Sequence, residues 1–253
     1  MRITNVPLIG WSLALVYLFI LSTSPAWGYR PFVSTDAAVE DLKEIEVQLG
    51  YFNLERTDGK TTFIIPQVEL DYGILNNLEV EAELEVAKPS DEDGIELVDS
   101  ELSLKAVLKE GILQEKNGLS IAVQASLLLP STVEEERNFG FKGVGILSEK
   151  ISFFTFHLNL GGGVDKVNPF VIWGMIGEVP IIPRFRLVGE VNGERVKGES
   201  FDNSGLLGFI WKSPWRDTFI DLGIRRGISG DAPDWGFTTG LTFSFSLGSS
   251  SGK

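Results

Sequence analysis

The sequence predicts an all-β protein, a transmembrane antiparallel β-barrel of about 12 strands in up-and-down meander order. First, apolar and polar residues alternate with a period of two along most of the chain. Second, turn signals divide the chain into segments that mostly reach the roughly 9 to 11 residues of a tilted membrane strand. Third, a chain with 35 Asp and Glu against 22 Lys and Arg is still 43% hydrophobic. An apolar outside and a charged inside reconcile these two properties.

Residues 1–28 are typical of a signal peptide. Arg2 is basic, the run from Pro7 to Leu21 carries no charge, and Ser24 to Gly28 ends in small residues. A retained membrane helix is the alternative, but the apolar run is shorter than the roughly 20 residues that span a bilayer. We expect cleavage after Gly28, a periplasmic N-terminal segment over 29–41, a barrel over 42–247 and a tail over 248–253.

The alternation is clearest in two segments. Leu78 to Val86 places apolar residues on one face and four glutamates on the other, and Phe237 to Leu247 opposes a greasy face to Gly, Ser and Thr. The predicted strands are 43–56, 61–73, 78–88, 95–109, 119–129, 139–148, 151–164, 169–179, 184–196, 204–213, 218–227 and 235–247. Twelve is an even number, as in single-chain bacterial barrels.

The connections between the strands favour a membrane barrel. Tight turns are expected at 75–77, 148–150 and 214–217, and the alternate connections are generally longer and more charged, which is the usual asymmetry of outer-membrane barrels. A soluble β-sandwich or lipocalin-like barrel is the alternative, because periodicity does not say which face points inward. Aromatic residues near strand ends and the exported N-terminus favour the cell outer membrane.

Composition excludes several function classes. The formal net charge of −13 argues against binding nucleic acid. The chain has no cysteine, which excludes disulfides and thiolate metal sites, and its one histidine, His157, has no nucleophile-elbow sequence nearby. We therefore expect no enzyme, no cofactor and no metal. The expected partners are outer-membrane lipid, the outer-membrane barrel assembly machinery and a small solute, and the oligomeric state stays open.

Turning the apolar rows outward directs charged side chains into the lumen. The predicted acidic wall consists of Glu69, Asp71, Glu79, Glu81, Glu83, Glu85, Asp99 and Glu101. The predicted lumen-facing basic residues are Arg186, Lys212 and Arg225. One hypothesis is a charged interior that favours cations, since charged walls set pore selectivity. The other is a salt-bridged, water-filled interior that is simply the solvated face.

Two short segments resemble a known family. Tyr29 to Glu40 reads YRPFVSTDAAVE, and Pro66 to Gly73 leads through Asn76 and Asn77 into a Glu-containing strand. Both are similar to the outer-membrane barrel family named after the meta pathway of phenol degradation. Members of that family begin with a segment of the type Arg-Pro-x-x-Thr-Asp-Asp-Ala, and here Ala37 replaces the second Asp. The chain also does not stop on the terminal aromatic residue that is typical of assembly signals. The resemblance implies a transporter or channel, often of hydrophobic or aromatic compounds.

These observations lead to a functional expectation with two alternatives. We expect an outer-membrane channel that passes small, hydrophobic or cationic solutes through a polar, acidic-walled lumen. The alternatives are a non-conducting structural or binding barrel and a soluble periplasmic ligand-binding β-protein. Residues 29–40 are longer than a strand lead-in requires, so one interpretation is that they cover or enter the lumen mouth.

Overall fold

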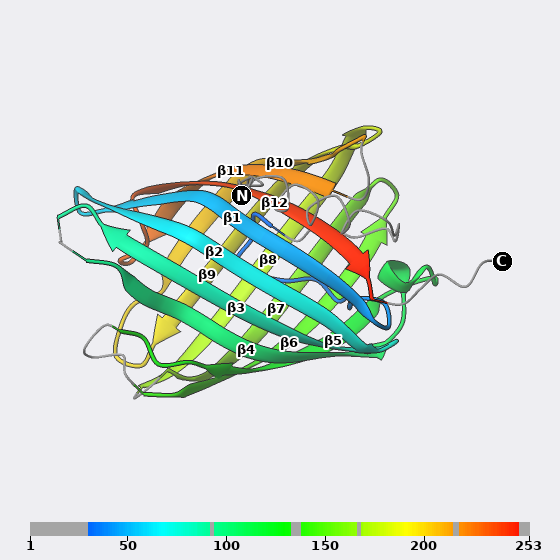
Figure 1. The fold of residues 1–253 in the computed structure, drawn as a ribbon, viewed down its shortest axis with the longest axis horizontal. Coiled ribbons are helices and arrows are strands. Elements are labelled where there is room, and N and C mark those ends of the chain that lie inside the picture. Colours follow the sequence, from blue (N-terminus) through cyan, green and yellow to red (C-terminus); the bar gives the residue numbers. More distant parts are fainter. Residues whose placement is uncertain (1–29, 92–93, 133–137, 166–167, 215–217, 248–253) are drawn as a thin grey trace, which may run out of the picture.

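A computed structural model describes residues 30–91, 94–132, 138–165, 168–214 and 218–247. These residues form a closed barrel in which each strand pairs with the next in sequence and β12 returns to β1 (Figure 1). All the pairings are antiparallel, so the predicted up-and-down barrel is confirmed. The predicted signal peptide over 1–28 and the tail over 248–253 lie outside the described residues. No described helix is long and apolar enough to cross a membrane.

The strands are long enough to cross a bilayer at a tilt. They are β1 Glu44–Thr57, β2 Lys60–Leu75, β3 Leu78–Pro89, β4 Glu96–Lys109, β5 Ser120–Leu128, β6 Gly140–Ile151, β7 Phe154–Asp165, β8 Asn168–Ile182, β9 Phe185–Val196, β10 Asp202–Lys212, β11 Thr218–Ser229 and β12 Trp235–Ser246. A single 3-10 turn, η1 Ile112–Gln114, interrupts the longer connection between β4 and β5. The barrel closes where Glu44 pairs with Ser246 and Arg56 pairs with Trp235.

The predicted boundaries agree with these strands to within three residues, with one informative difference. A turn was predicted at 148–150, but β6 continues to Ile151 and the turn falls at residues 152–153. Ser152 adopts a φ of 60°, the left-handed conformation that reverses the chain there. Ser148 is instead completely buried within the strand, because its hydroxyl pairs with groups inside the barrel.

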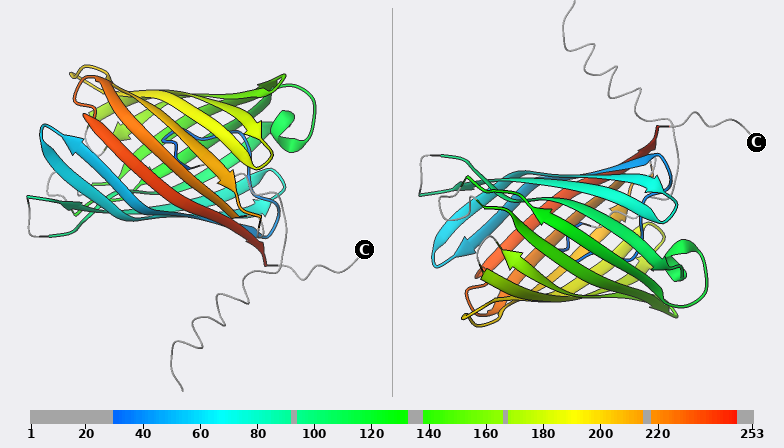
Figure 2. Two further views of the ribbon diagram at one scale, coloured as in Figure 1. Left: turned by 90° about the horizontal axis from the view of Figure 1, so that it is seen from above. Right: turned by 90° about the horizontal axis from the view of Figure 1, so that it is seen from below.

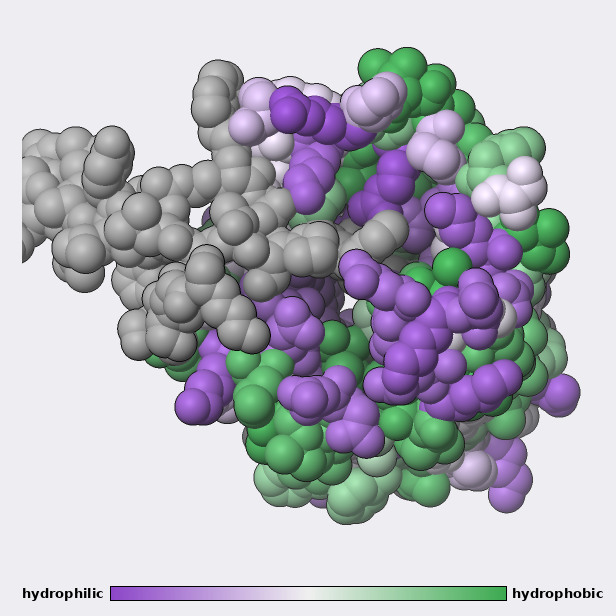
Figure 3. Space-filling model, turned by 90° about the vertical axis from the view of Figure 1, so that its right-hand side faces the viewer, coloured by the Kyte–Doolittle hydropathy of each residue, from purple (hydrophilic) through white to green (hydrophobic). Residues whose placement is uncertain are grey.

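The distribution of burial decides which face of the sheet points inward. Among the described residues, 27 buried side chains are polar or charged and only 12 are hydrophobic. Large apolar side chains such as Leu84, Leu104 and Leu207 are exposed instead, on the outer wall. Viewed from the end that carries η1, hydrophilic side chains gather around the middle and hydrophobic ones lie on the rim (Figure 3). A soluble β-sandwich or lipocalin-like barrel requires the opposite arrangement, with the apolar rows inside. In water, the arrangement observed here would expose those apolar rows to solvent.

A closed ring also satisfies the hydrogen-bonding demand of a membrane interior. Strands that pair on both sides leave no open sheet edge, so their backbone donors and acceptors find partners within the protein. The glycines of β7 allow close packing in this ring: a Cβ on Gly163 would lie 1.8 Å from the carbonyl oxygen of Phe141 on the neighbouring strand. Only glycine fits at that backbone approach.

Candidate functional site

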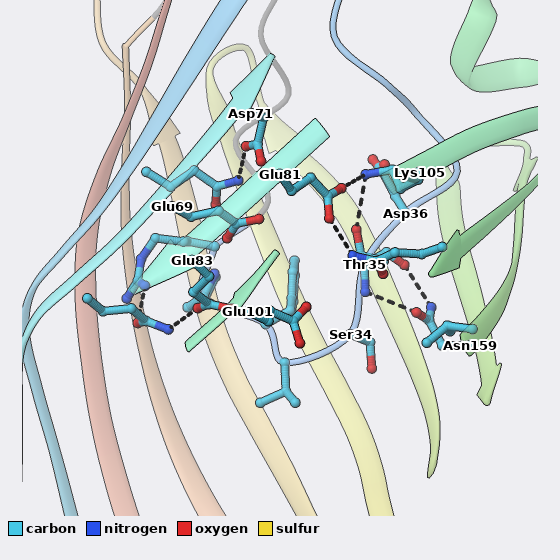
Figure 4. Close-up of a pocket in the computed structure, with 18 of the residues that line it drawn as sticks. Ser34, Thr35, Asp36, Glu69, Asp71, Glu81, Glu83, Glu101, Lys105 and Asn159 are labelled. Carbon is cyan, nitrogen blue, oxygen red and sulfur yellow. Dashed lines mark hydrogen bonds and ion pairs between the residues drawn. The ribbon is translucent and has the colours of Figure 1, made fainter. Parts of the chain in front are cut away.

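The interior of the barrel contains a cavity of about 1120 Å³. Its lining reaches Asn76 and Glu110 near the end of the barrel that carries η1, and Asp165 and Glu194 near the opposite end. The cavity therefore follows most of the length of the barrel. It is the candidate functional site, and Figure 4 shows part of its wall.

Residues 30–43, which we call the strap, run inside the barrel before β1 begins (Figure 2). The guanidinium of Arg30 donates to Asn53 at 3.1 Å and Thr238 at 2.8 Å, contacts Gln67, and lies 3.7 Å from the carboxylate of Asp221. This end of the strap is therefore held by β1, β2, β11 and β12. Phe32, the next aromatic residue, packs on a buried cluster of Val188, Ile210 and Phe219.

The rest of the strap crosses to the other side of the barrel through backbone hydrogen bonds. The amide of Ser34 donates to Glu190 at 2.8 Å, and the amide of Thr35 donates to Asn159 at 3.1 Å. The Asn159 side chain returns a hydrogen bond of 2.7 Å to the carbonyl of Thr35. The sequence suggested that residues 29–40 cover or enter the lumen mouth, and the described part of this segment does enter the lumen.

Two further contacts secure the end of the strap that leads into β1. The amide of Ala37 donates to Ser148 at 3.0 Å, and the amide of Glu40 donates to Glu79 at 2.6 Å. Burial, reinforced by the neighbouring carboxylates of Glu79 and Glu44, raises the pKa of Glu40 to about 8. Burial also raises the pKa of Asp36 above its usual range, against the opposing attraction of Lys105. The strap thus brings carboxyl groups of its own into the lumen.

All eight residues of the predicted acidic wall line the cavity. They come from three adjacent strands: Glu69 and Asp71 from β2, Glu79, Glu81, Glu83 and Glu85 from β3, and Asp99 and Glu101 from β4. Asp99 lies at a register shift between β3 and β4 and has a φ of 40°. The alternation in the sequence placed these side chains on one face, and closure of the sheet turns that face inward.

Two lysines neutralise part of this wall. The Lys105 ammonium lies 2.7 Å from Glu79 and 3.0 Å from Glu81, and it also reaches the strap at the Thr35 hydroxyl, 3.5 Å away. The Lys142 ammonium lies 2.6 Å from Glu101. The sequence analysis did not name Lys142 among the lumen-facing basic residues. Strict alternation would have found it, because its neighbour Phe141 faces outward and Lys142 must then point inward.

The three predicted basic residues have different positions. Arg225 lines the cavity and pairs with Glu190 at 2.7 Å. Arg186 and Lys212 are not among the residues that line it; the Arg186 guanidinium lies 2.8 Å from Glu178 and 5.8 Å from the centre of the Phe219 ring. The Lys212 ammonium lies 5.3 Å from that ring centre. The charges of Arg186 and Arg225 are thus paired with carboxylates on their own side of the barrel.

His157 belongs to a buried polar network and not to the cavity wall. Its Nδ1 lies 2.8 Å from the Ser148 hydroxyl and its Nε2 lies 3.1 Å from Glu178. The order resembles a hydrolase triad, but Ser148 is fully buried and already accepts the amide hydrogen of Ala37. Neither Ser148 nor His157 lines the cavity. Among the described residues, no group of three or more metal-binding side chains is spaced to hold an ion.

Sequence comparison and structural comparison give different results. No protein-family model matches the sequence, and no curated protein matches it. An outer-membrane channel from Pseudomonas putida F1 has a similar structure, with a TM-score of 0.64 at 10% identity over 85% of this chain and 100% of that chain. The NanC porin gives a TM-score of 0.56 at 9% identity, over 80% of this chain and 100% of that porin.

A third similar structure is the KdgM porin in complex with disordered oligogalacturonate, with a TM-score of 0.57 at 10% identity over 80% of this chain and 99% of that porin. At such low sequence identities, the similarity shows a shared fold and nothing more. Fold, apolar outer wall and polar interior together define an outer-membrane β-barrel of the porin-like class. Membership of the family named after the meta pathway of phenol degradation stays a prediction from the two short segments.

Proposed function

We propose that this protein is a passive outer-membrane channel whose interior favours small cations. The observation that carries the proposal is the charge of the cavity wall: 18 of its lining residues are Asp or Glu, and four are Lys or Arg. A confined space of low dielectric focuses such a field, which raises the local concentration of cations and lowers that of anions. Outer-membrane channels are also among the proteins with similar folds.

The strap sets how wide the path is. It crosses the lumen from Arg30 at one wall to Asn159 at the other, so the solute must pass beside it. The proposed channel is consequently narrow, and its conductance should rise when residues 30–41 are deleted. This arrangement also favours a second function, a non-conducting barrel that binds or presents a partner, because a barrel can fill its own interior with side chains and chain segments.

Planar bilayer recording tests the proposal and separates these two functions. The protein purified from outer membranes should give discrete conductance steps with a reversal potential that favours potassium over chloride in a salt gradient. Replacing Glu69 and Glu83 by glutamine should move the reversal potential toward zero, since no described cationic side chain pairs with either carboxylate. Stable insertion without steps, in the native chain and the strap deletion alike, contradicts the channel.

The matched control replaces Glu149 and Glu199 by glutamine. These carboxylates are not among the cavity-lining residues, so the pair removes the same net charge without changing the wall. Its reversal potential should equal that of the native protein. An equal shift in the control pair would attribute selectivity to the overall charge of the protein and contradict a role for the lumen.

A further inference from the structure

Four carboxylates on three adjacent strands, Glu46, Glu69, Asp71 and Glu83, form what we call the carboxylate patch. Glu46 on β1 lies directly opposite Asp71 on β2, and Glu69 on β2 lies directly opposite Glu83 on β3. All four line the cavity. Like charges directly opposite each other in a sheet destabilise it, so this arrangement calls for positive charge between them.

No described cationic side chain forms an ion pair with any of these four carboxylates. Lys105 is paired with Glu79 and Glu81, and Lys142 is paired with Glu101. The patch instead receives neutral donors: the Gln48 amide donates to Asp71 at 3.0 Å and the Gln67 amide donates to Glu83 at 2.9 Å. These neutral donors hold the carboxylates in place, but they do not bring a positive charge into direct contact with them.

Asp71 gives an independent indication that a donor is missing. Its exposed fraction is 5%, and while Gln48 donates to its Oδ2 atom, its Oδ1 atom is buried with no hydrogen-bond partner among the described residues. A buried carboxylate oxygen without a donor is costly, since it has lost its water and received nothing in return. Because Asp71 also lines the cavity (Figure 4), a ligand in the cavity can supply the missing N–H.

The spacing of the patch selects the kind of cation. No described group of three or more carboxylates is placed to coordinate a single metal ion. The patch has two rows, Glu46 with Asp71 and Glu69 with Glu83, and Asp71 and Glu69 are two residues apart on β2. Two residues of strand correspond to roughly 7 Å. Two ammonium groups joined by a short methylene chain have a comparable separation. They carry the positive charge that neither row receives from an ion pair, and an N–H donor for the Oδ1 atom of Asp71.

We propose that the carboxylate patch is a binding subsite for linear organic diamines, with one ammonium group on each row. This inference rests on the proposed function only in that the ligand reaches the patch through the lumen. The cavity volume of about 1120 Å³ exceeds what such a ligand occupies, so the patch is one wall of a wider path. Salt weakens the binding, because both contacts are ionic and water reaches the lumen.

Isothermal titration of the detergent-purified native protein with 1,4-diaminobutane tests the subsite, and 1-aminobutane is the matched monovalent ligand. We expect the diamine to bind at least about tenfold more tightly, since it makes a second ionic contact. Asp71→Asn and Glu69→Gln should each weaken diamine binding by about fivefold or more and leave the monoamine less affected. Glu199→Gln, which removes a carboxylate outside the cavity lining, should leave both affinities unchanged.

Three outcomes overturn the proposal. They are equal affinities for diamine and monoamine, diamine binding that is unchanged in both patch variants, and displacement of the diamine by an equal concentration of calcium chloride, which would indicate a metal site. Heat-modifiable migration on gels verifies that each variant is folded, and removal of a like charge is not expected to harm folding. Titration in detergent does not depend on conduction, so the two proposals can fail separately. Diamine binding without conductance contradicts the channel alone. Conductance without diamine binding contradicts the subsite alone.

Discussion

Glu190 on β9 is the carboxylate that fixes the middle of the strap. Its Oε1 accepts the amide of Ser34 at 2.8 Å and its two oxygens accept the amide of Val33 at 3.2 Å, while Oε2 also pairs with Arg225 at 2.7 Å. Glu190→Ala therefore removes two backbone anchors of the strap. Glu190 is 2% exposed, so water does not easily replace its carboxylate in these contacts.

The size of the effect follows from these contacts. A hydrogen bond to a charged group contributes about 1.5 to 3 kcal/mol. Taking the lower value for each of the two amides gives a loss of about 3 kcal/mol in strap docking, which corresponds to an increase of about 100-fold in the ratio of undocked to docked strap. Glu190→Gln keeps the acceptor oxygen and removes the charge, so its effect should be intermediate.

Cysteine labelling measures this ratio, since the chain has no cysteine of its own. Ser34→Cys is nearly isosteric and places a thiol where Ser34 packs against Gly174. A maleimide should label this thiol about 100-fold faster in the Glu190→Ala background, because labelling requires the undocked strap. Glu194→Ala on the same strand is the matched control, and its rate should equal that of the parent.

The outcome that refutes the reasoning is specific. Equal labelling rates in the Glu190→Ala and Glu194→Ala backgrounds, in protein that still shows heat-modifiable gel migration, would mean that Glu190 does not anchor the strap. Equal rates in Glu190→Ala and Glu190→Gln would mean that the charge of Glu190 carries the whole effect and the acceptor geometry none of it.

Two further predictions concern charges inside the barrel. Lys105→Met leaves the carboxylates of Glu79 and Glu81 without their cation and should destabilise the protein by about 3 to 5 kcal/mol in urea unfolding, whereas Lys109→Met, at an exposed position of the same strand, should change stability by less than about 0.5 kcal/mol. The pKa of the Glu40 carboxyl is 4.5 in the unfolded chain and about 8 in the folded protein. Between these two pH values, folding takes up a proton at this group. The stability that Glu40 contributes is therefore lost as the pH rises from about 4.5 to about 8. The thermal midpoint of the native protein should therefore fall more steeply over this interval than that of Glu40→Gln, and parallel curves would contradict the raised pKa.

The sequence by itself determined the strand number, most strand boundaries and the two faces of the sheet. Those features depend on local alternation and turn residues, which can be read directly from the sequence. Glu79, Glu81 and Glu83, for example, occupy every second position, so they lie on one face of the strand whatever its neighbours are. The acidic wall was predictable for the same reason. Its orientation toward the lumen followed once the apolar rows were assigned to lipid, and the burial of the polar rows agrees with it.

Contacts between residues distant in the chain could not be predicted in this way. Nothing near Arg30 in the sequence indicates Thr238, which lies 208 positions later, and nothing near Ser34 indicates Glu190. Only closure of the ring brings these walls within reach of the strap, because it places every strand around one shared interior. Alternation predicts that a side chain points inward, but the tertiary structure decides which groups it meets there. It therefore decides that Arg225 is paired with Glu190, while the Oδ1 atom of Asp71 has no donor among the described residues.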